Sequence, residues 1–132
     1  MARREHGASA VEFAIVFPVL FLLLAAIVDF GRAYFYQAQL TNAAREGVRA
    51  AVVSSLTAAE IKARAAASVP GLASASLTYP VLDQCPSASG NAKMTVTAPF
   101  EWIVLKPAIS IIGGSWGMGN TLSSTAVMKC GG

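Results

Sequence analysis

An acidic side chain in an apolar stretch is the first chemical feature of this sequence: Glu12 lies near the start of a long apolar run. An acidic residue costs roughly 3 kcal/mol at the centre of a membrane helix, and less towards its ends, so it usually faces a partner rather than lipid. If the chain were cut between Gly7 and Ala8, Ala8 would carry a new α-amino group on the same helix face as Glu12. That amine could pair with Glu12 of its own helix or of a neighbour. Either pairing lowers the cost of burying both charges, and the second also sets the register between subunits.

Catalytic and metal-binding patterns are missing from the sequence. The single histidine is His6, near the start, so a metal site or a histidine-dependent catalytic group elsewhere is close to excluded, and no cofactor is expected. Serine-rich stretches lack a histidine base, and no carboxylate pair or nucleophile motif is recognisable. The acidic residues beyond the apolar run are scattered: Glu46, Glu60, Asp83 and Glu101. We therefore expect a protein that is not an enzyme.

Composition favours a membrane-associated chain. Of the 132 residues, 55% are hydrophobic and 13% are charged, against roughly 25% charged residues in ordinary soluble domains. Such a chain is too apolar to be disordered throughout. Lys and Arg number 10 against 7 acidic residues, which gives a net charge of +3. Because these charges form no cluster larger than Arg3-Arg4, we expect no nucleic-acid partner.

The apolar residues concentrate in one candidate membrane span. Residues 13–28 contain no polar side chain, and as a helix they extend about 24 Å, slightly less than the roughly 30 Å hydrocarbon core of a bilayer. Adding residues 8–11 and Phe30 completes a crossing. Because Arg3 and Arg4 precede it, we expect a single-pass protein of the cytoplasmic (inner) membrane, with its N-terminus inside and its C-terminal part outside.

Three other interpretations of this segment compete with a processed membrane helix. A buried core helix that is so uniformly apolar needs a larger protein around it. A secretory signal peptide fits the basic start, but bulky and charged residues follow the apolar run, from Asp29 to Gln37, where a small-residue cleavage site is expected. An uncleaved membrane anchor is the strongest of the three, and it leaves Glu12 unexplained.

The N-terminal region resembles the TadE-like pseudopilins, which are minor pilins of the tight-adherence (Tad, type IVc) pilus system. The resemblance covers roughly residues 3–53, with a short basic leader that ends at Gly7, Glu12 at the fifth position after it, and an apolar run that contains Pro18. Two further matching motifs are Asp29-Phe30-Gly31-Arg32 and Thr41-Asn42-Ala43-Ala44-Arg45-Glu46-Gly47. Phe13 stands where the major pilins of this system have tyrosine, which favours a minor pilin.

This resemblance implies a maturation step and a set of partners. A membrane prepilin peptidase would remove residues 1–7 as a leader by cutting after Gly7 on the cytoplasmic side. Gly7 and Ala8 are then the processing residues, and Glu12 is the residue for assembly and register. The other implied partners are the lipid bilayer, the other pilins of the fibre and the inner-membrane platform that assembles it. The mature subunit would move from the membrane to a pilus at the cell surface, with a role in adhesion.

The helical pattern continues beyond the apolar run. Residues 33–53 contain no proline, and small or apolar residues recur every three or four positions: Leu40, Ala43, Ala44, Gly47, Ala50 and Ala51. We expect one long helix over residues 8–54, membrane-spanning in its first half. The stripe of small residues packs either against this chain's own sheet or against helices of a pilus bundle. We favour the sheet, because a sheet needs a helix to cover it.

Residues 55–132 are predicted to form a small extracytoplasmic α+β module. Thr57 and Glu60 make a capping box, which predicts a helix from about Ala58 to just before Pro70. Segments with alternating apolar residues predict three strands of one antiparallel sheet: residues 73–81, 93–102 and 122–129. The expected fold class is therefore α+β and pilin-like, with a long N-terminal transmembrane helix packed against a small antiparallel sheet and one short second helix.

The module also contains both cysteines and a long connection between strands. Cys85 and Cys130 show no metal-binding spacing, and two cysteines on the translocated side favour one disulfide over two free thiols. Residues 103–120 are predicted to be a loop. Its isoleucines and Trp116 either fill the core, which we favour, or face another pilin.

Two functions are consistent with these features. The first is a structural minor pilin or pseudopilin of a Tad pilus, cleaved after Gly7 and assembled through its N-terminal helix. The second is an uncleaved, single-span membrane-anchored protein whose module binds a partner outside the membrane. Only the first predicts that loss of Gly7 or Glu12 impairs processing or assembly.

Overall fold

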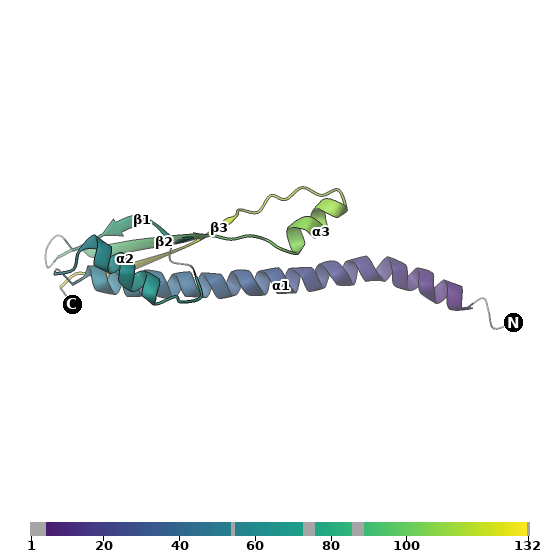
Figure 1. Ribbon diagram of the computed structural model, residues 1–132, viewed down its shortest axis with the longest axis horizontal. Helices are drawn as coiled ribbons and strands as arrows, with labels where there is room; N and C mark the ends of the chain where they lie inside the picture. Colours follow the sequence, from purple (N-terminus) through teal and green to yellow (C-terminus); the bar gives the residue numbers. More distant parts are fainter. Residues whose placement is uncertain (1–4, 54, 73–75, 86–88, 132) are drawn as a thin grey trace. The chain divides into compact units, whose positions relative to one another are not determined.

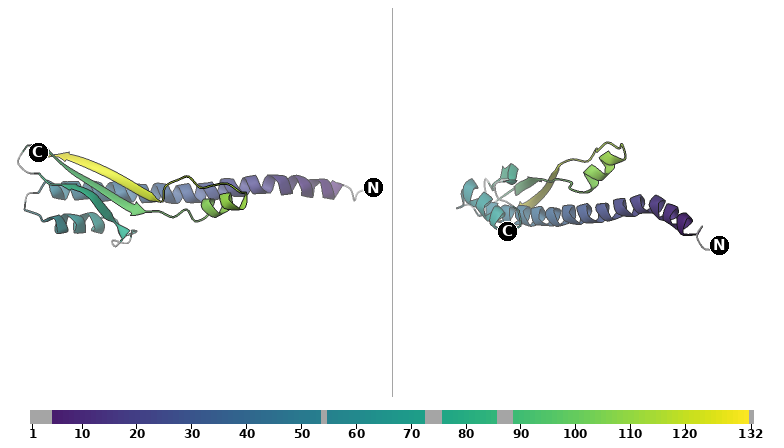
Figure 2. Two further views of the ribbon diagram at one scale, coloured as in Figure 1. Left: turned by 90° about the horizontal axis from the view of Figure 1, so that it is seen from above. Right: turned by 45° about the vertical axis from the view of Figure 1, so that its right-hand side comes forward.

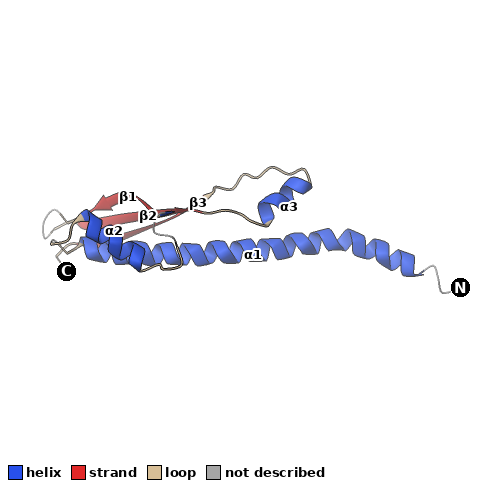
Figure 3. Cartoon of the chain, in the orientation of Figure 1, coloured by secondary structure: helices blue, strands red, loops and turns tan. Residues whose placement is uncertain are grey.

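The computed structural model describes residues 5–53, 55–72, 76–85 and 89–131 (Figure 1). In chain order, its elements are helix α1 (Glu5–Ala51), helix α2 (Ala58–Ala67), strand β1 (Thr78–Asp83), strand β2 (Asn91–Pro99), helix α3 (Leu105–Ile111) and strand β3 (Thr121–Lys129). The fold class is α+β, as predicted, with a long apolar N-terminal helix, a three-stranded antiparallel sheet and further short helices (Figure 3).

The chain forms two compact units, and α1 contributes to both of them. The first unit comprises the chain up to Arg32 together with Trp102–Met118, and the second comprises Ala33–Glu101 and the chain from Gly119 onwards. The N-terminal part of α1 therefore shares a unit with α3, and the rest of α1 shares a unit with the sheet and α2.

Helix α1 is continuous over 47 residues and contains Pro18. It starts at Glu5 rather than at Ala8 and ends at Ala51. The last turn tightens, since the Val53 N–H donates to the Ala50 carbonyl at 3.1 Å, an i→i−3 bond that is frequent at helix ends. Residues 1–4 of the predicted leader, and Ser54 at the predicted end of the helix, lie outside the described residues.

The stripe of small residues on α1 packs inside the second unit. All its members are buried: Leu40, Ala43, Ala44, Gly47, Ala50 and Ala51. They share one hydrophobic core with side chains from β2 and α2, among them Met94, Val96, Ala98, Ile61 and Ala65. The prediction that this stripe covers the chain's own sheet is therefore confirmed.

Gly47 marks a close approach of α1 to this core. A Cβ atom at this position would overlap Met94 Sδ and would lie 3.2 Å from Ala65 Cβ. Helix α1 can lie this close to β2 and α2 because residue 47 has no side chain.

Strand β2 is the centre of the sheet, with β1 and β3 antiparallel on either side (Figure 2). The predicted alternation holds in β2, where the buried residues are Ala92, Met94, Val96 and Ala98. β2 and β3 pair without interruption from Asn91↔Lys129 to Pro99↔Thr121. The first strand begins at Thr78, later than predicted, and residues 73–75 of the predicted strand lie outside the described residues.

Helix α2 begins at the predicted capping box. The Thr57 N–H donates to Glu60 Oε2 at 2.7 Å, and the Glu60 N–H donates to Thr57 Oγ1 at 3.3 Å. In the same unit, a disulfide joins Cys85 to Cys130, with their Cα atoms 5.8 Å apart. Because Cys85 follows β1 and Cys130 follows β3, this bond ties the two outer strands together.

Part of the predicted loop 103–120 is helical, so that prediction was wrong for Leu105–Ile111, which forms α3. Leu105 and Ala108 are buried, whereas Ile111 and Ile112 are exposed. Core filling, which we favoured, therefore holds for only part of the segment. No local side chain caps α3, since Val104 at the N-cap position makes no side-chain hydrogen bond. The acceptor for its first N–H groups comes instead from α1.

Candidate functional site

The predicted processing and assembly residues lie near the start of α1 and are exposed. Gly7, Ala8 and Glu12 all have exposed side-chain positions, and a Cβ atom added at Gly7 would meet nothing within 4 Å. Ala8 and Glu12 are one helical turn apart, on the same face of α1. Glu12 has no hydrogen bond or ion pair with the described part of the chain, so its carboxylate is available to a partner.

The apolar stretch that follows Glu12 is largely uncovered. Every residue from Phe13 to Phe21 is exposed, and α1 is long and apolar enough to cross a membrane. Phe17 is among the bulky side chains of this stretch, and about half of its surface is exposed. Bulky apolar groups in such numbers are compatible with a single-pass membrane anchor, in which lipid or other helices would cover them.

Asp29, at the end of the apolar stretch, is the one charged residue that is fully buried among those described, with 0% exposure. Its Oδ2 accepts the backbone N–H groups of Leu105 at 2.7 Å and of Val104 at 2.9 Å. Its Oδ1 accepts the Ile103 N–H at 3.3 Å and Arg32 Nη1 at 3.2 Å. Both carboxylate oxygens are therefore satisfied, which is the condition for burying such a group.

The bonds from Asp29 explain why α3 forms where no helix was predicted. The first N–H groups of a helix have no partner within the helix, and a side-chain oxygen at the N-cap normally accepts one of them. Here the acceptor lies 76 residues earlier in the chain. Asp29 thus fixes the start of α3 against α1, and we call this arrangement the Asp29 clamp.

An aromatic cluster lies beside the Asp29 clamp, in the same unit. The ring of Trp102 meets Phe30 edge-on, with centroids 5.3 Å apart, and lies 5.1 Å from the ring of Trp116. Trp102 and Trp116 stand near the two ends of the segment that contains α3. Their contact therefore brings the two ends of that segment together next to residues 29 and 30 of α1, and we call this end of the segment its base.

In the second unit, α1 carries polar contacts to β3. Gln37 Nε2 donates to the Ser123 carbonyl at 2.8 Å, and the hydroxyls of Thr41 and Ser124 lie 3.1 Å apart. Thr41 Oγ1 also donates to the Gln37 carbonyl at 2.9 Å. The motif from Thr41 to Gly47 thus begins with a hydrogen bond to the sheet and ends at the close approach of Gly47.

The N-terminal part of the chain matches a known family model. Residues 7–49 match the model described as TadE-like protein. The N-terminal region is TadE-like. The match begins at Gly7 and takes in Glu12 and Asp29. No curated protein and no solved structure matches the chain.

The structure divides the residues of the TadE-like region into two groups: exposed residues and residues that hold the fold together. Gly7, Ala8 and Glu12 are exposed near the start of α1. Asp29 and the motif from Thr41 to Gly47 instead hold the fold together, since the first clamps α3 and the second packs on the sheet. Among the residues that the structure describes, no three His, Cys, Asp or Glu side chains gather as metal ligands would.

Sequence reasoning missed the role of Asp29. In the sequence, Asp29 stands out only as part of the motif Asp29-Phe30-Gly31-Arg32 at the end of the apolar run. Its position does indicate that the carboxylate has a partner, because an acidic side chain at the end of an apolar stretch is rarely left unpaired. Arg32 is a local partner, whereas the backbone of residues 103–105 is a distant one that no sequence pattern identifies.

Proposed function

We propose that this protein is a minor pilin or pseudopilin of a Tad (type IVc) pilus, cleaved after Gly7 by a prepilin peptidase and assembled through α1. The observation that carries the proposal is the TadE-like match that starts at Gly7 on an exposed apolar helix. A peptidase can reach Gly7, because the residue is exposed and packs against nothing. Cleavage there would leave Ala8 as the new N-terminus, one helical turn before Glu12.

Assembly would exchange one apolar environment for another. In the membrane, lipid would cover the exposed apolar face of α1, and in the fibre the helices of other pilins would cover it. Glu12 is exposed and has no hydrogen bond or ion pair with the described residues, so its carboxylate can accept the Ala8 amine of the same helix or of a neighbouring subunit. The second pairing would set the stagger between subunits. The partners are the peptidase, the inner-membrane platform and the other pilins.

The same proposal gives the protein an orientation. The N-terminus would lie in the cytoplasm, since Arg3 and Arg4 precede the span. The second unit, with the sheet, would lie outside, and its disulfide between Cys85 and Cys130 agrees with an oxidising compartment. After extraction from the membrane, this unit would face the outside of the pilus, at the cell surface.

The decisive experiment measures the mature N-terminus. The full chain is expressed in membranes with and without an active Tad prepilin peptidase, and its intact mass and N-terminal sequence are determined. We expect a mature chain that starts at Ala8 only when the peptidase is present. Gly7→Ala should stay uncut, and because a Cβ atom at Gly7 meets nothing within 4 Å, a folding defect would not account for that loss.

Gly31→Ala is the matched control for this variant. It makes the same change on the same helix, at another position where an added Cβ atom meets nothing within 4 Å, and we expect it to be cut normally. A wild-type chain that stays uncut beside an active peptidase contradicts the proposal. That result would leave the alternative, an uncleaved single-span anchor with an external binding module.

A further inference from the structure

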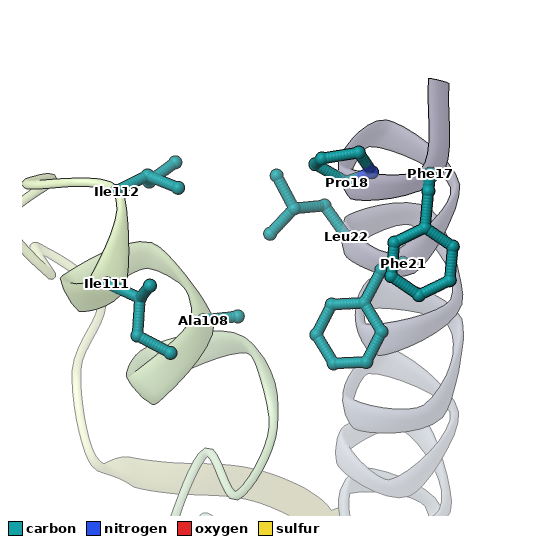
Figure 4. A pocket seen from close by; sticks show the side chains of 7 residues that line it. All are labelled: Phe17, Pro18, Phe21, Leu22, Ala108, Ile111 and Ile112. Carbon is teal, nitrogen blue, oxygen red and sulfur yellow. The ribbon is translucent and has the colours of Figure 1, made fainter. Parts of the chain in front are cut away.

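An apolar hollow lies within the first unit, between α1 and α3. Its volume is about 190 Å³. Helix α1 lines one side and α3 with the residue after it lines the other (Figure 4). All seven lining residues are apolar: Phe17, Pro18, Phe21, Leu22, Ala108, Ile111 and Ile112.

The position of the hollow along α1 places it at membrane depth. Leu22 and Phe17 precede Asp29 by about 10 and 18 Å at the helical rise of about 1.5 Å per residue. Half of a bilayer's hydrocarbon core is about 15 Å thick. If Asp29 lies at the boundary of that core, the hollow faces the inner part of the nearer leaflet. Helix α3, held at its start by Asp29, would then run into this leaflet beside α1.

The segment 103–118 has the surface of a membrane-inserted element. Ile111 is 83% exposed and Ile112 is 64% exposed, which is a costly arrangement in water. Lys106 is its single charged residue, close to the Asp29 clamp, where a lysine side chain can reach the headgroups. Trp102 and Trp116 meet at the base of the segment, at the level where tryptophan is enriched in membrane proteins.

Three polar groups at the C-terminal end of α3 are paired within this segment. Beyond α3, the Gly113 N–H donates to the Ser110 carbonyl at 3.1 Å, and the Gly114 N–H donates to the Ile109 carbonyl at 3.0 Å. The Ser110 hydroxyl donates to the Pro107 carbonyl at 2.7 Å. At the other end, Asp29 accepts the N–H groups that begin α3. The two ends of α3 therefore meet the requirement that hydrocarbon places on a polypeptide backbone.

We propose that residues 103–118 form a re-entrant element that enters the leaflet nearest Asp29, and that the hollow between α3 and α1 holds an acyl chain of a membrane lipid. The inference rests on α1 crossing the membrane, as in the proposed function, and it does not require cleavage or assembly. A bilayer lipid is the occupant because the hollow opens beside a membrane-spanning helix, whose neighbours before assembly are acyl chains. Water is a poor occupant, since even an apolar cavity of about 150 Å³ stays dry and accepts a hydrocarbon.

The test asks whether the tip of α3 touches lipid. A photocrosslinking amino acid replaces Ile111 in the full chain, which is reconstituted into phosphatidylethanolamine and phosphatidylglycerol vesicles with alkyne-tagged acyl chains. Leu24 on α1 and Val127 on β3 are the two control positions. Their exposed fractions match each other, at 59%. Illumination and mass spectrometry then measure lipid attachment, and the same substitution at Ile112 gives an independent reading if the first variant misfolds.

We expect lipid attachment at residue 111 to equal that at residue 24 and to exceed that at residue 127 by about tenfold or more, because burying Ile112, which this variant retains, already favours the inserted state by that factor. Lipid attachment at Leu24 with only the Val127 level at Ile111 and Ile112 would overturn this inference and leave the membrane anchor intact. Crosslinks from Ile111 to a second copy of the chain would also overturn it, in favour of a pilin neighbour. No lipid attachment at Leu24 would contradict the membrane span itself, and with it the proposed function.

Discussion

The carboxylate of Asp29 accepts the backbone N–H of Leu105 at 2.7 Å, across 76 residues of sequence. The bond joins the end of the apolar stretch of α1 to the first residue of α3, and it belongs to a group of four hydrogen bonds on one buried carboxylate. Asp29 therefore has a structural role inside this chain, distinct from the role proposed for Glu12. Asp29 is satisfied internally, whereas Glu12 is left for a partner.

Neutralising Asp29 should loosen α3. Asn can accept through only one oxygen and carries no charge, and a hydrogen bond to a charged group contributes about 1.5–3 kcal/mol. In detergent micelles, we expect Asp29→Asn to speed amide hydrogen exchange at Ile103, Val104 and Leu105 by about tenfold to a hundredfold, since each 1.4 kcal/mol is about a factor of ten. Asp83→Asn, at the exposed end of β1, is the control. Unchanged exchange in Asp29→Asn would show that the clamp does not hold α3.

A side chain at Gly47 should destabilise the second unit. Gly47→Ala places a Cβ atom onto Met94 Sδ, and overpacking a core costs about 1–3 kcal/mol, whereas alanine improves helix propensity by about 1 kcal/mol. We expect a net loss of stability in chemical denaturation. Gly31→Ala lies in open space on the same helix. It should show only the gain that comes from the higher helix propensity of alanine.

A double-mutant cycle identifies the cause of that loss. Met94→Ala removes the side chain that a Cβ atom at residue 47 would overlap, so the two changes should be less harmful together than their separate costs predict. Additive losses would mean that Met94 is not the group that excludes a side chain from position 47.

The capping box of α2 should make stability depend on pH in the acid range. The pKa of Glu60 is lowered because its carboxylate accepts hydrogen bonds from the backbone and the hydroxyl of Thr57. A carboxyl whose folded-state pKa lies below its unfolded value stabilises the fold above the unfolded pKa, which is about 4.3. That contribution is lost as pH falls through the lower, folded-state pKa.

The measurement compares the unfolding of wild type and Glu60→Gln from neutral pH down to strongly acid pH. We expect wild type to be the more stable at neutral pH and the difference to shrink as the solution is acidified. Asp83→Asn, which also removes one negative charge at an exposed position away from the capping box, controls for the change in net charge. A difference between wild type and Glu60→Gln that is constant with pH would count against this account of the cap.

Neutralising Glu12 should separate cleavage from assembly. Glu12→Gln keeps the size of the side chain and loses its charge, so the buried amine of Ala8 would have no ionic partner. Breaking a buried ion pair in this way costs about 3–5 kcal/mol, and we expect at least about tenfold less subunit in sheared pili, with cleavage after Gly7 retained. Immunoblots of pilus and membrane fractions measure both steps, and Glu46→Gln makes the same change on the same helix. Normal incorporation of Glu12→Gln would exclude the register role.

Several parts of the fold followed from local patterns. The small residues from Leu40 to Ala51 predicted a helix face that covers a sheet, and Thr57 with Glu60 predicted the start of α2. The alternation around Met94 predicted the central strand. These predictions succeeded because each depends on periodicity or on a bond between residues close in sequence, and such interactions are readable in the chain itself.

Local patterns were enough to predict the long apolar helix, the position of Glu12 one turn after Ala8, and the α+β class. The helical conformation of residues 105–111 and the burial of Asp29 arise only in the folded chain. A short helix without a local cap depends on an acceptor for its first N–H groups, and here that acceptor comes from a distant part of the chain. A contact over such a separation exists only once the chain has folded, so no pattern around Leu105 records it.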